Sequence, residues 1–583
     1  MDKQTDSDEE DDTFLAYLEK GDFEFSLKED HSELRSDLEQ RLAEARSDRV
    51  YWEQIWKDLA DYISPAHGKF ILQDTTRKKG SASRNKIFSN VGKKALNTLA
   101  SGMLGGLSGQ TKPWFQLADS TPNAEEDPKN GVWLSDVVDI MRQTMHKTNT
   151  YDAFYSCYND IGLFGTHAMI VYEDEDKIFR CHALPIGQYY LSADSKGEIT
   201  GLYREYRMTL KQMVDQFGLK AVSENARKAY MERRGFETEY TIRQAIQPNK
   251  EYDPKAVGVK ARAYIDVYWE VGSPPDTLLS YTGFHEKPFV APAWSRPLGE
   301  AYGESPAMEA LPDIKQLQFY QKEKAEIIQM YTKPPVVASK ALENQPTAFY
   351  ARGVTFTADI NTIGAKPLMQ INGDISGVQA ETQELKQRIA DAFFEDLWLM
   401  MNNIEGVQPR SFMEIAERKG EKIVMLSPAI QKVQNEFLSP FIDRVFAIMY
   451  RRGLFPEPPD SLKNGADLKI EYVSDLSLAQ NVKNTVPIEQ LLAITGNMMS
   501  VAPEVQAKVD FYQAIDDYSQ SIGVPPRIMI PTKKAIAINE QKAQQAQQQQ
   551  MMEQMPAMAQ SAKALSETPV GAGSNALQSM LGL

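Results

Sequence analysis

The sequence predicts an α+β protein in which helices predominate. Apolar residues recur at helical spacing over most of the 583 residues, and two such stretches, 303–333 and 377–401, are long and nearly equal in length. Between about residues 168 and 281 the pattern changes to short runs of β-branched and aromatic residues separated by turn sequences. A chain of this length, with 42% hydrophobic and 25% charged residues, suits three or four modules with ample core.

The N-terminal part begins with an acidic segment and continues as a long helix. Residues 1–30 include the run Asp8-Glu9-Glu10-Asp11-Asp12, and a run of like charges cannot bury enough apolar surface to order itself. We therefore expect residues 1–30 to be largely disordered. From Ser32 to Ile63 an apolar stripe predicts a helix, which Ser64-Pro65 ends.

Residues 86–302 are expected to combine helices with an inserted β-module. Helices are predicted at 86–109, in two stretches within 131–165, and at 209–217. Strands are predicted at 168–172, 179–184, 188–191, 199–206, 263–271 and 278–281. The glycines that follow residue 101 lack the spacing of a phosphate-binding P-loop, so they predict no nucleotide site.

The stretch from Gly303 to Gly453 organises the chain. Ser305 can cap a helix whose first turn holds Pro306, and Lys333-Pro334-Pro335 stops it because proline lacks a donor. After a Pro/Gly-rich module of short strands and turns, a second long helix runs back over residues 377–401. A short polar loop and a third helical stretch, which breaks at a proline, complete this region.

Downstream of Gly453 the sequence predicts one strand and several helices. The strand covers 468–473, and the helical pattern begins at 477, with segments at 488–499 and 505–522. Residues 532–555 are rich in Gln, Ala and Met, which are good helix formers, but they lack a wide apolar stripe. Two interpretations stay open: helices that shield one another in a ring, or a disordered low-complexity tail.

Six motifs occur in order between Tyr302 and Pro456. They are Tyr302-Gly303-Glu304-Ser305-Pro306, Ala310-Leu311-Pro312-Asp313-Ile314-Lys315, Lys333-Pro334-Pro335, Phe412-Met413-Glu414-Ile415-Ala416-Glu417-Arg418, Glu436-Phe437-Leu438-Ser439-Pro440 and Arg451-Arg452-Gly453-Leu454-Phe455-Pro456. This series resembles the head-to-tail connector (portal) proteins of short-tailed, podovirus-type bacteriophages. The usual Thr-Ala-Thr-Glu-Val helix start of that family is kept only loosely, as Ser411-Phe412-Met413-Glu414-Ile415.

The resemblance implies a portal-type subunit made of named parts. These are a wing (31–302 and 412–460), a two-helix stem (303–333 and 377–401), a small α/β clip (334–376), a channel loop (402–411), a helical crown (461–530), a possible Gln-rich barrel helix (531–560) and a flexible tail (561–583). It further implies a homo-oligomeric ring of twelve copies at one capsid vertex of the virion, assembled in the host cytoplasm. The implied partners are tail adaptor proteins at the clip, the terminase large subunit, the major capsid and scaffolding proteins, and double-stranded DNA in the channel.

Three sets of residues are candidates for functional contacts in such a ring. The channel loop consists of Asn402, Asn403, Ile404, Glu405, Gly406, Val407, Gln408, Pro409 and Arg410, and Arg410 is the best single candidate for a phosphate contact. The candidates for basic positions facing the pore are Lys315, Lys322, Lys324, Lys386 and Arg388, although a helical lysine is usually only solvated. The tail-docking clip covers Val336 to Ile375.

The net charge of −16 argues against a protein that grips DNA tightly, because tight binding relies on a basic surface that releases counterions. A mainly acidic wall suits a conduit through which a duplex slides, whereas the simpler interpretation is that acidity keeps the surface soluble.

Catalytic chemistry is not indicated. The six histidines are scattered without metal-ligand spacing, there are only two cysteines, and no nucleophile motif occurs, so we expect no enzyme activity and no cofactor. No apolar run is long enough to span a bilayer, and we expect no membrane partner.

Two other classes of protein remain as alternatives to a portal. A ring-shaped tail adaptor or scaffold would lack an opening wide enough for duplex DNA, which axial imaging would reveal. A DNA-processing enzyme would show nuclease or ATPase turnover, although the sequence lacks the P-loop and acidic motifs of such enzymes.

Overall fold

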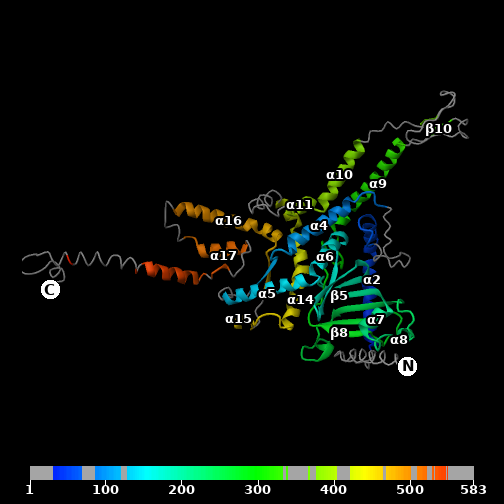
Figure 1. Ribbon diagram of the computed structural model, residues 1–583, viewed down its shortest axis with the longest axis horizontal. Coiled ribbons are helices and arrows are strands. Elements are labelled where there is room, and N and C mark those ends of the chain that lie inside the picture. The colour runs from blue at the N-terminus through cyan, green and yellow to red at the C-terminus, as the bar shows by residue number, and fades with distance from the viewer. Residues whose placement is uncertain are drawn as a thin grey trace, which may run out of the picture. The chain divides into compact units, whose positions relative to one another are not determined.

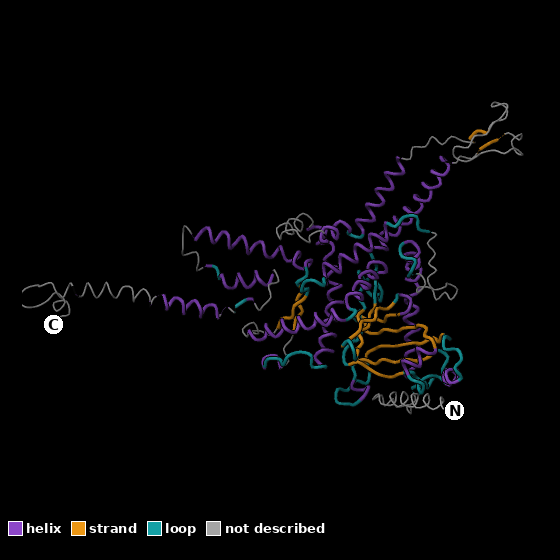
Figure 2. The backbone as a smooth tube through the Cα atoms, viewed as in Figure 1, coloured by secondary structure: helices purple, strands orange, loops and turns teal. Residues whose placement is uncertain are grey.

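The computed structural model describes residues 31–67, 86–119, 128–332, 336–338, 365–367, 376–402, 420–463, 468–499, 508–521, 528–530, 532, 534–546, 548 and 563. The chain divides into two compact units, one built from residues 1–113 and 141–454 and the other from residues 114–140 and 455–583. Helices and strands of both units are drawn in Figures 1 and 2.

In the first unit, a long helix covers one face of a five-stranded antiparallel sheet (Figure 1). The helix is α2 (Ser32–Tyr62), and the strands, in spatial order, are β4 (Tyr189–Ala193), β5 (Ile199–Thr209), β6 (Glu239–Pro248), β7 (Tyr264–Glu270) and β8 (Ser280–Phe284). Leu38, Leu42 and Ala45 of α2 form one buried cluster with Ala245, Val267 and Trp269 of the sheet. The predicted helix and its end before Ser64-Pro65 are confirmed.

The opposite face of this sheet carries two short helices, α7 (Leu210–Phe217) and α8 (Glu224–Met231). Leu210 and Met213 of α7 pack with Ile242 and Tyr268, whose side chains alternate with those that face α2. Thr209 begins α7 with a capping box, in which its side chain accepts a hydrogen bond from the backbone N–H of Gln212.

A smaller sheet has the order β3-β2-β9, formed by β3 (Ile178–Leu184), β2 (Ala168–Asp174) and β9 (Phe289–Val290). The β2–β3 hairpin predicted from the sequence is confirmed, with Ala168 paired to Leu184. Its turn is fixed by the Asp174 carboxylate, which accepts hydrogen bonds at 2.9 Å from the backbone N–H groups of Asp176 and Lys177.

A helical layer completes the body of the first unit. Its helices include α4 (Val91–Ser108), α6 (Thr150–Phe164), α13 (Gly420–Val433) and α14 (Ser439–Arg451). The side chains of Phe154 on α6 and Phe441 on α14 meet edge to face, with ring centroids 4.9 Å apart. Between α13 and α14, residues Gln434–Leu438 form one π-helical turn, η5. This turn precedes Pro440, which cannot donate to the preceding turn, so the predicted break at a proline takes the form of a π-turn within continuous helix.

The remaining elements of the first unit are α9 (Pro306–Thr332), α10 (Ser376–Ala392), α11 (Glu395–Asn402), β10 (Val336–Ala338), β11 (Ala365–Pro367) and the 3₁₀ turns η2 (Ile186–Gln188) and η3 (Gly258–Ala261). In the part of the chain that the structure describes, no helix has the length and apolarity needed to cross a membrane.

The second unit contains a two-stranded antiparallel sheet and several helices. β1 (Phe115–Asp119) pairs with β12 (Leu468–Tyr472), and the helices are α15 (Asp460–Lys463), α16 (Asp475–Met499) and α17 (Phe511–Ser521). The helix α5 (Pro128–Lys147) contributes its residues up to 140 to this unit. The indole N–H of Trp133 on α5 donates to the Pro456 carbonyl at 3.0 Å. Residues 534–546 of the Gln-rich stretch are helical.

Candidate functional site

The candidate site is the helix pair α9 and α10, and its first residues are anchored in the body of the first unit. The Ser305 hydroxyl accepts a hydrogen bond from the backbone N–H of Met308 at 3.1 Å and donates to the Leu163 carbonyl at 2.9 Å. Ser305 thus caps α9, as predicted, and also ties the helix start to α6. The Tyr302 hydroxyl, fully buried, accepts from the backbone N–H of Leu191 at 3.1 Å.

Two glycines allow the chain to enter α9 in contact with the end of α6. Gly165 has a φ of +78°, and a Cβ atom added to it would lie 2.0 Å from the Gly303 carbonyl oxygen. The Gly303 N–H in turn donates to the Thr166 hydroxyl at 2.8 Å. No side chain fits between these backbones, so the close approach of the two segments requires a glycine at position 303.

The base of the pair is well packed, and its outer part is not. Ala310, Ile314 and Leu317 of α9 and Leu385 and Ile389 of α10 are buried. Beyond Gln318, no α9 side chain that the structure describes is buried. Phe319, Ile328 and Met330 are 57%, 45% and 45% exposed, although all three are apolar. Figure 1 shows α9 and α10 running side by side away from the rest of the first unit.

The predicted second long helix, 377–401, is wrong as a single helix. α10 ends at Ala392, and Phe394 adopts a φ of +54° before α11 begins at Glu395. The break allows the fully buried Trp398 of α11 to pack against Gly102 of α4, where an added Cβ would lie 2.5 Å from the indole ring. Tertiary packing on α4 therefore overrides the helical pattern of the sequence.

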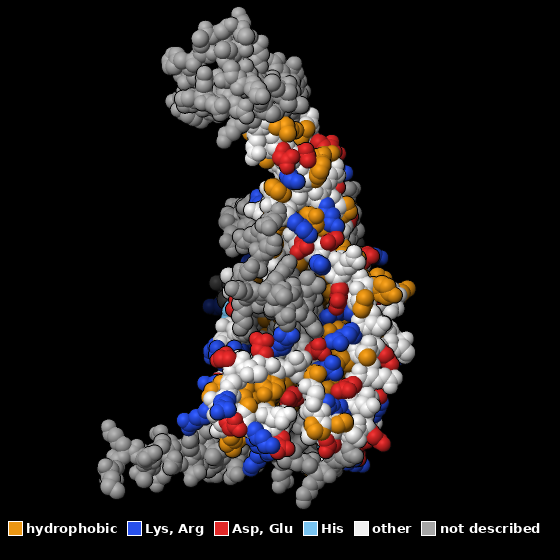
Figure 3. Space-filling model, turned by 90° about the vertical axis from the view of Figure 1, so that its right-hand side faces the viewer, with side chains coloured by type: hydrophobic (Ala, Val, Ile, Leu, Met, Phe, Trp, Pro, Cys, Tyr) orange, Lys and Arg blue, Asp and Glu red, His pale blue; other side chains and the backbone are white. Residues whose placement is uncertain are grey.

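The five predicted basic positions have different surroundings. Lys315 forms an ion pair with Asp58 of α2 at 2.6 Å, Arg388 lies 3.8 Å from Asp313 of α9, and Lys322 lies 3.7 Å from Glu326 one turn along the same helix. Lys324 and Lys386 have no ion pair with any residue that the structure describes. At the upper end of the described surface in Figure 3, basic, acidic and hydrophobic side chains lie intermixed.

The structure describes only fragments of the two predicted contact segments. Of the clip, Val336 to Ile375, it describes β10 and β11, which pair antiparallel with Val336 opposite Pro367. Of the channel loop, it describes Asn402, the last residue of α11. Asn403, Ile404, Glu405, Gly406, Val407, Gln408, Pro409 and Arg410 lie outside the described residues.

Two polar anchors of the site have bonding partners that the sequence did not predict. On the π-turn, the Glu436 carboxylate accepts from the Ala293 N–H and from Arg296, each at 3.1 Å, and so holds the segment that leads to Tyr302. Burial lowers the pKa of the Arg296 guanidinium, although Glu436 opposes this effect. On α9, the buried Gln318 side chain accepts from the backbone N–H groups of Phe88 and Ser89 at 2.6 and 2.8 Å and fixes the approach to α4.

Among the residues that the structure describes, no group of three or more His, Cys, Asp or Glu side chains is placed to hold a metal ion. The two helices carry a partly apolar, partly charged surface away from the packed body of the first unit.

Comparison with known proteins assigns the family. The family model described as the bacteriophage head to tail connecting protein matches residues 35–530, and the chain belongs to this family. It is 36% identical over 533 residues to the portal protein of Salmonella phage epsilon15, an alignment covering 91% of this chain and 95% of that protein. It is 34% identical over 507 residues to a probable portal protein of Bordetella phage BPP-1, covering 87% and 90% of the two chains.

Solved structures with a detectable likeness include chains from gene transfer agent (GTA) particles. A chain from the neck of an empty GTA particle has 12% identity and a TM-score of 0.34, with 70% of this chain and 86% of that chain covered. A chain from a native GTA virion has 12% identity and a TM-score of 0.32, with 70% and 85% covered. These values carry no argument about this chain.

Proposed function

We infer that this chain is a phage portal protein: it forms a ring at one capsid vertex, conducts double-stranded DNA during packaging and ejection, and provides a docking platform for terminase and tail proteins. The observation that carries this inference is the identity of about 35% to a portal protein and a probable portal protein over nearly the whole length of the chains. The role is one of assembly and passage rather than of catalysis, and the work of packaging would come from the terminase motor.

The structure of α9 and α10 supports a ring. Identical subunits close a ring through heterologous interfaces, in which one face of each copy meets a different face of the next. Phe319, Ile328 and Met330 on the outer part of α9 are large apolar side chains that are exposed in the single chain. In a ring, proposed to contain twelve copies, a neighbouring copy would bury them.

The mass of the purified particle tests this proposal. Twelve times the 65.7 kDa of the chain is about 790 kDa, which light scattering after size exclusion would resolve from smaller species. A stable monomer at micromolar concentration would contradict the ring. The tail adaptor or scaffold alternative gives a ring as well, but one whose axial image has no opening that admits a duplex.

The channel loop and the basic positions are proposed to act on DNA within that ring. Deleting residues 403–408 should leave the ring intact and impair DNA packaging or retention. If the deletion abolishes ring assembly instead, the segment is a structural joint and not a pore element.

Lys324 and Lys386 are the two predicted basic positions whose charge no described carboxylate neutralises. Replacing both by Gln should lower the yield of packaged DNA, because a mainly acidic channel needs a few cations as weak phosphate contacts. Lys228→Gln on α8 is the control, since Lys228 is exposed and its ion pair within the described residues is with Glu224, one turn earlier on the same helix. An equal effect of the control and the double variant would refute the pore assignment.

A further inference from the structure

The five-stranded sheet is an insertion into the smaller sheet. The chain leaves the smaller sheet after β3, which ends at Leu184, and returns to it at β9, which begins at Phe289. All strands of the larger sheet, β4 to β8, lie between these two points. Two short connections therefore join the sheets, and contacts between side chains decide how firmly β2 and β3 are held on the larger sheet.

Polar side chains make this contact, on the face of the larger sheet opposite α2. Arg204 of β5, Gln244 of β6 and Tyr268 of β7 are directly opposite one another and form one row across three strands. The Gln244 carboxamide accepts from Arg204 at 2.9 Å and donates to the hydroxyl of Tyr172 on β2 at 3.0 Å. The hydroxyls of Tyr172 and Tyr268 are 3.2 Å apart. Arg204 also donates to Nε2 of His182 on β3 at 3.2 Å.

A buried carboxyl group, Asp266, lies among these contacts, and we name it and the five residues above the polar seam. Asp266 precedes Tyr268 by two positions on β7, so its side chain is on the same face, and it is 3% exposed. Gln244 donates to it at 2.8 Å, and it has no ion pair with any residue that the structure describes. Burial raises the pKa of Asp266 to about 7, although Gln244 and Arg204 act to lower it. A carboxylate is costly to bury without a paired cation, so this site favours the protonated acid.

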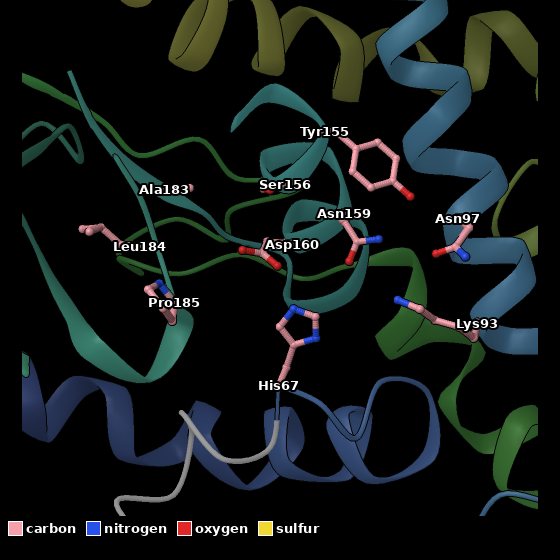
Figure 4. A pocket seen from close by; sticks show the side chains of 10 residues that line it. All are labelled: His67, Lys93, Asn97, Tyr155, Ser156, Asn159, Asp160, Ala183, Leu184 and Pro185. Atoms are coloured by element: carbon pink, nitrogen blue, oxygen red, sulfur yellow. The ribbon is translucent and has the colours of Figure 1, made fainter. Parts of the chain in front are cut away.

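Another aspartate of the first unit, Asp160 on α6, has different surroundings. It lines a recess of about 510 Å³ that Lys93 of α4 also lines, and Figure 4 shows both side chains. Its carboxylate is 2.9 Å from Nδ1 of His167. An ionised Asp160 thus has solvent and a nearby ammonium group, whereas an ionised Asp266 has neither.

The other titratable groups at the seam keep one charge state between pH 5 and pH 8. Partial burial and the charges of Arg204 and Arg180 lower the pKa of His182 to about 4, so its imidazole is neutral in this range. Burial raises the pKa values of the tyrosines at this contact, which are Tyr172, Tyr206 and Tyr268. The guanidinium of Arg204 stays charged. Asp266 is therefore the group of the seam that changes charge in this range.

We propose that the polar seam is a pH-sensitive latch: with Asp266 protonated it holds β2 and β3 on the five-stranded sheet, and ionisation of Asp266 opens it. In the open state the carboxylate is hydrated and has its ordinary pKa of 3.8, whereas in the closed state the pKa is about 7. The closed state binds the proton more tightly, so the open fraction rises with pH between these two values and is constant above them. This proposal does not depend on the portal function.

Thiol labelling of the full-length protein measures the opening. Ile246 of β6 is fully buried, lies on the face of the seam and is directly opposite Asp266, so Ile246→Cys places a thiol under the latch. Ala245→Cys is the matched control, because Ala245 is the preceding residue of the same strand and packs toward α2. Dithiodipyridine labels the thiols, and each rate is divided by that of an unfolded cysteine peptide at the same pH. Mass spectrometry of peptides separates these positions from the native Cys157 and Cys181.

The latch has a defined pH dependence. From pH 5 to pH 8 the normalised rate at position 246 should rise by up to about 100-fold, because the pKa of Asp266 is 3.8 in the open state and about 7 in the closed state. At pH 8 it should exceed the rate at position 245 at least about tenfold, since a local opening leaves α2 in place. Asp266→Asn should make the rate at position 246 independent of pH. Asp215→Asn, on the exposed side of α7, is the control substitution and should change the rates less than about twofold.

Three results would overturn the proposal. Equal rates at positions 245 and 246 would show that the thiols react only on global unfolding. A rate at position 246 that does not rise with pH, or a rise that persists in Asp266→Asn, would remove Asp266 from the opening. Leu202→Cys repeats the measurement from β5, because Leu202 is fully buried directly opposite Ile246, and it excludes an effect of the cavity made by Ile246→Cys. Thermal melting confirms that each variant is folded.

Discussion

The contact between Gly102 and Trp398 fixes α11 on α4 below the α9–α10 pair, and replacing the glycine tests that arrangement. Trp398 is fully buried, and a Cβ atom at position 102 would lie 2.5 Å from two of its ring carbons. Ordinary contacts between carbons are about 3.5–4.0 Å, so the indole must move by roughly 1 Å or more. Gly102→Ala therefore forces a rigid side chain out of a filled core.

The expected magnitude follows from two opposing effects. Alanine in place of glycine inside a helix stabilises by about 1 kcal/mol, whereas overpacking of a core costs typically 1–3 kcal/mol and occasionally more. Because the overlap is with a ring that cannot flex, we expect a net destabilisation of about 1–3 kcal/mol. Gly105→Ala in the same helix is the control: Gly105 is exposed, and its replacement should be neutral or stabilising.

Hydrogen exchange measured by mass spectrometry reports the loss of local stability in α4 and α11. Peptides from α4 and α11 should exchange roughly 5- to 150-fold faster in Gly102→Ala, which corresponds to 1–3 kcal/mol of local opening. Adding Trp398→Leu should recover part of that loss, because the smaller side chain removes the overlap. Unchanged exchange in Gly102→Ala, or additive effects of the two substitutions, would refute the proposed packing of α11.

Three further predictions concern the cap of α9, the buried carboxyl of Asp266 and the partly exposed carboxylate of Glu286. Ser305→Ala removes the cap of α9 and the bond to Leu163, and should accelerate exchange at the helix start by an amount equal to about 0.5–2 kcal/mol, with no effect on α7. Burial raises the pKa of Asp266 to about 7, although a hydrogen bond from Gln244 lowers it. Folding then favours the protonated form, so the stability that Asp266 contributes is fully present below the ordinary pKa of Asp, is lost as the pH rises toward 7 and does not return above it. Asp266→Asn should remove this slope and raise stability at pH 8 by up to roughly 4 kcal/mol in denaturant titrations. For Glu286, burial acts to raise the pKa, but hydrogen bonding by Arg451 and the charge of Arg444 outweigh it and lower the pKa. The stability from this cluster is present above the ordinary pKa of Glu and is lost as the pH falls below it, and Glu286→Gln should flatten that acid limb.

Local signals explain which elements could be predicted from the sequence. The start of α9 is set by Ser305 and Pro306, and α2 ends before Ser64-Pro65, so the ends of both helices lie within three residues of the predicted ones. The sequence did not predict strand β6, because its polar residues obscure the alternation of apolar and polar side chains that marks a strand. Arg243 and Gln244 look exposed in the sequence, yet they bond to Glu205 and Asp266 inside the sheet.

Contacts between residues far apart in the sequence explain the features that could not be predicted. Nothing near Phe394 in the sequence marks a left-handed residue, and the break there depends on Trp398 meeting Gly102, almost 300 positions earlier. Lys315 is paired with Asp58, which is 257 residues away, so its surroundings could not be read from its own helix. The motifs around Gly303 and Glu436 marked important positions, but only the structure shows that the first permits a close backbone approach and the second anchors Arg296.

Imaging of the purified, assembled protein along its symmetry axis tests the portal assignment most directly. The expected particle is a closed ring of identical copies around an opening that admits a DNA duplex. A monomer, or a ring whose centre is closed to a duplex, would contradict it.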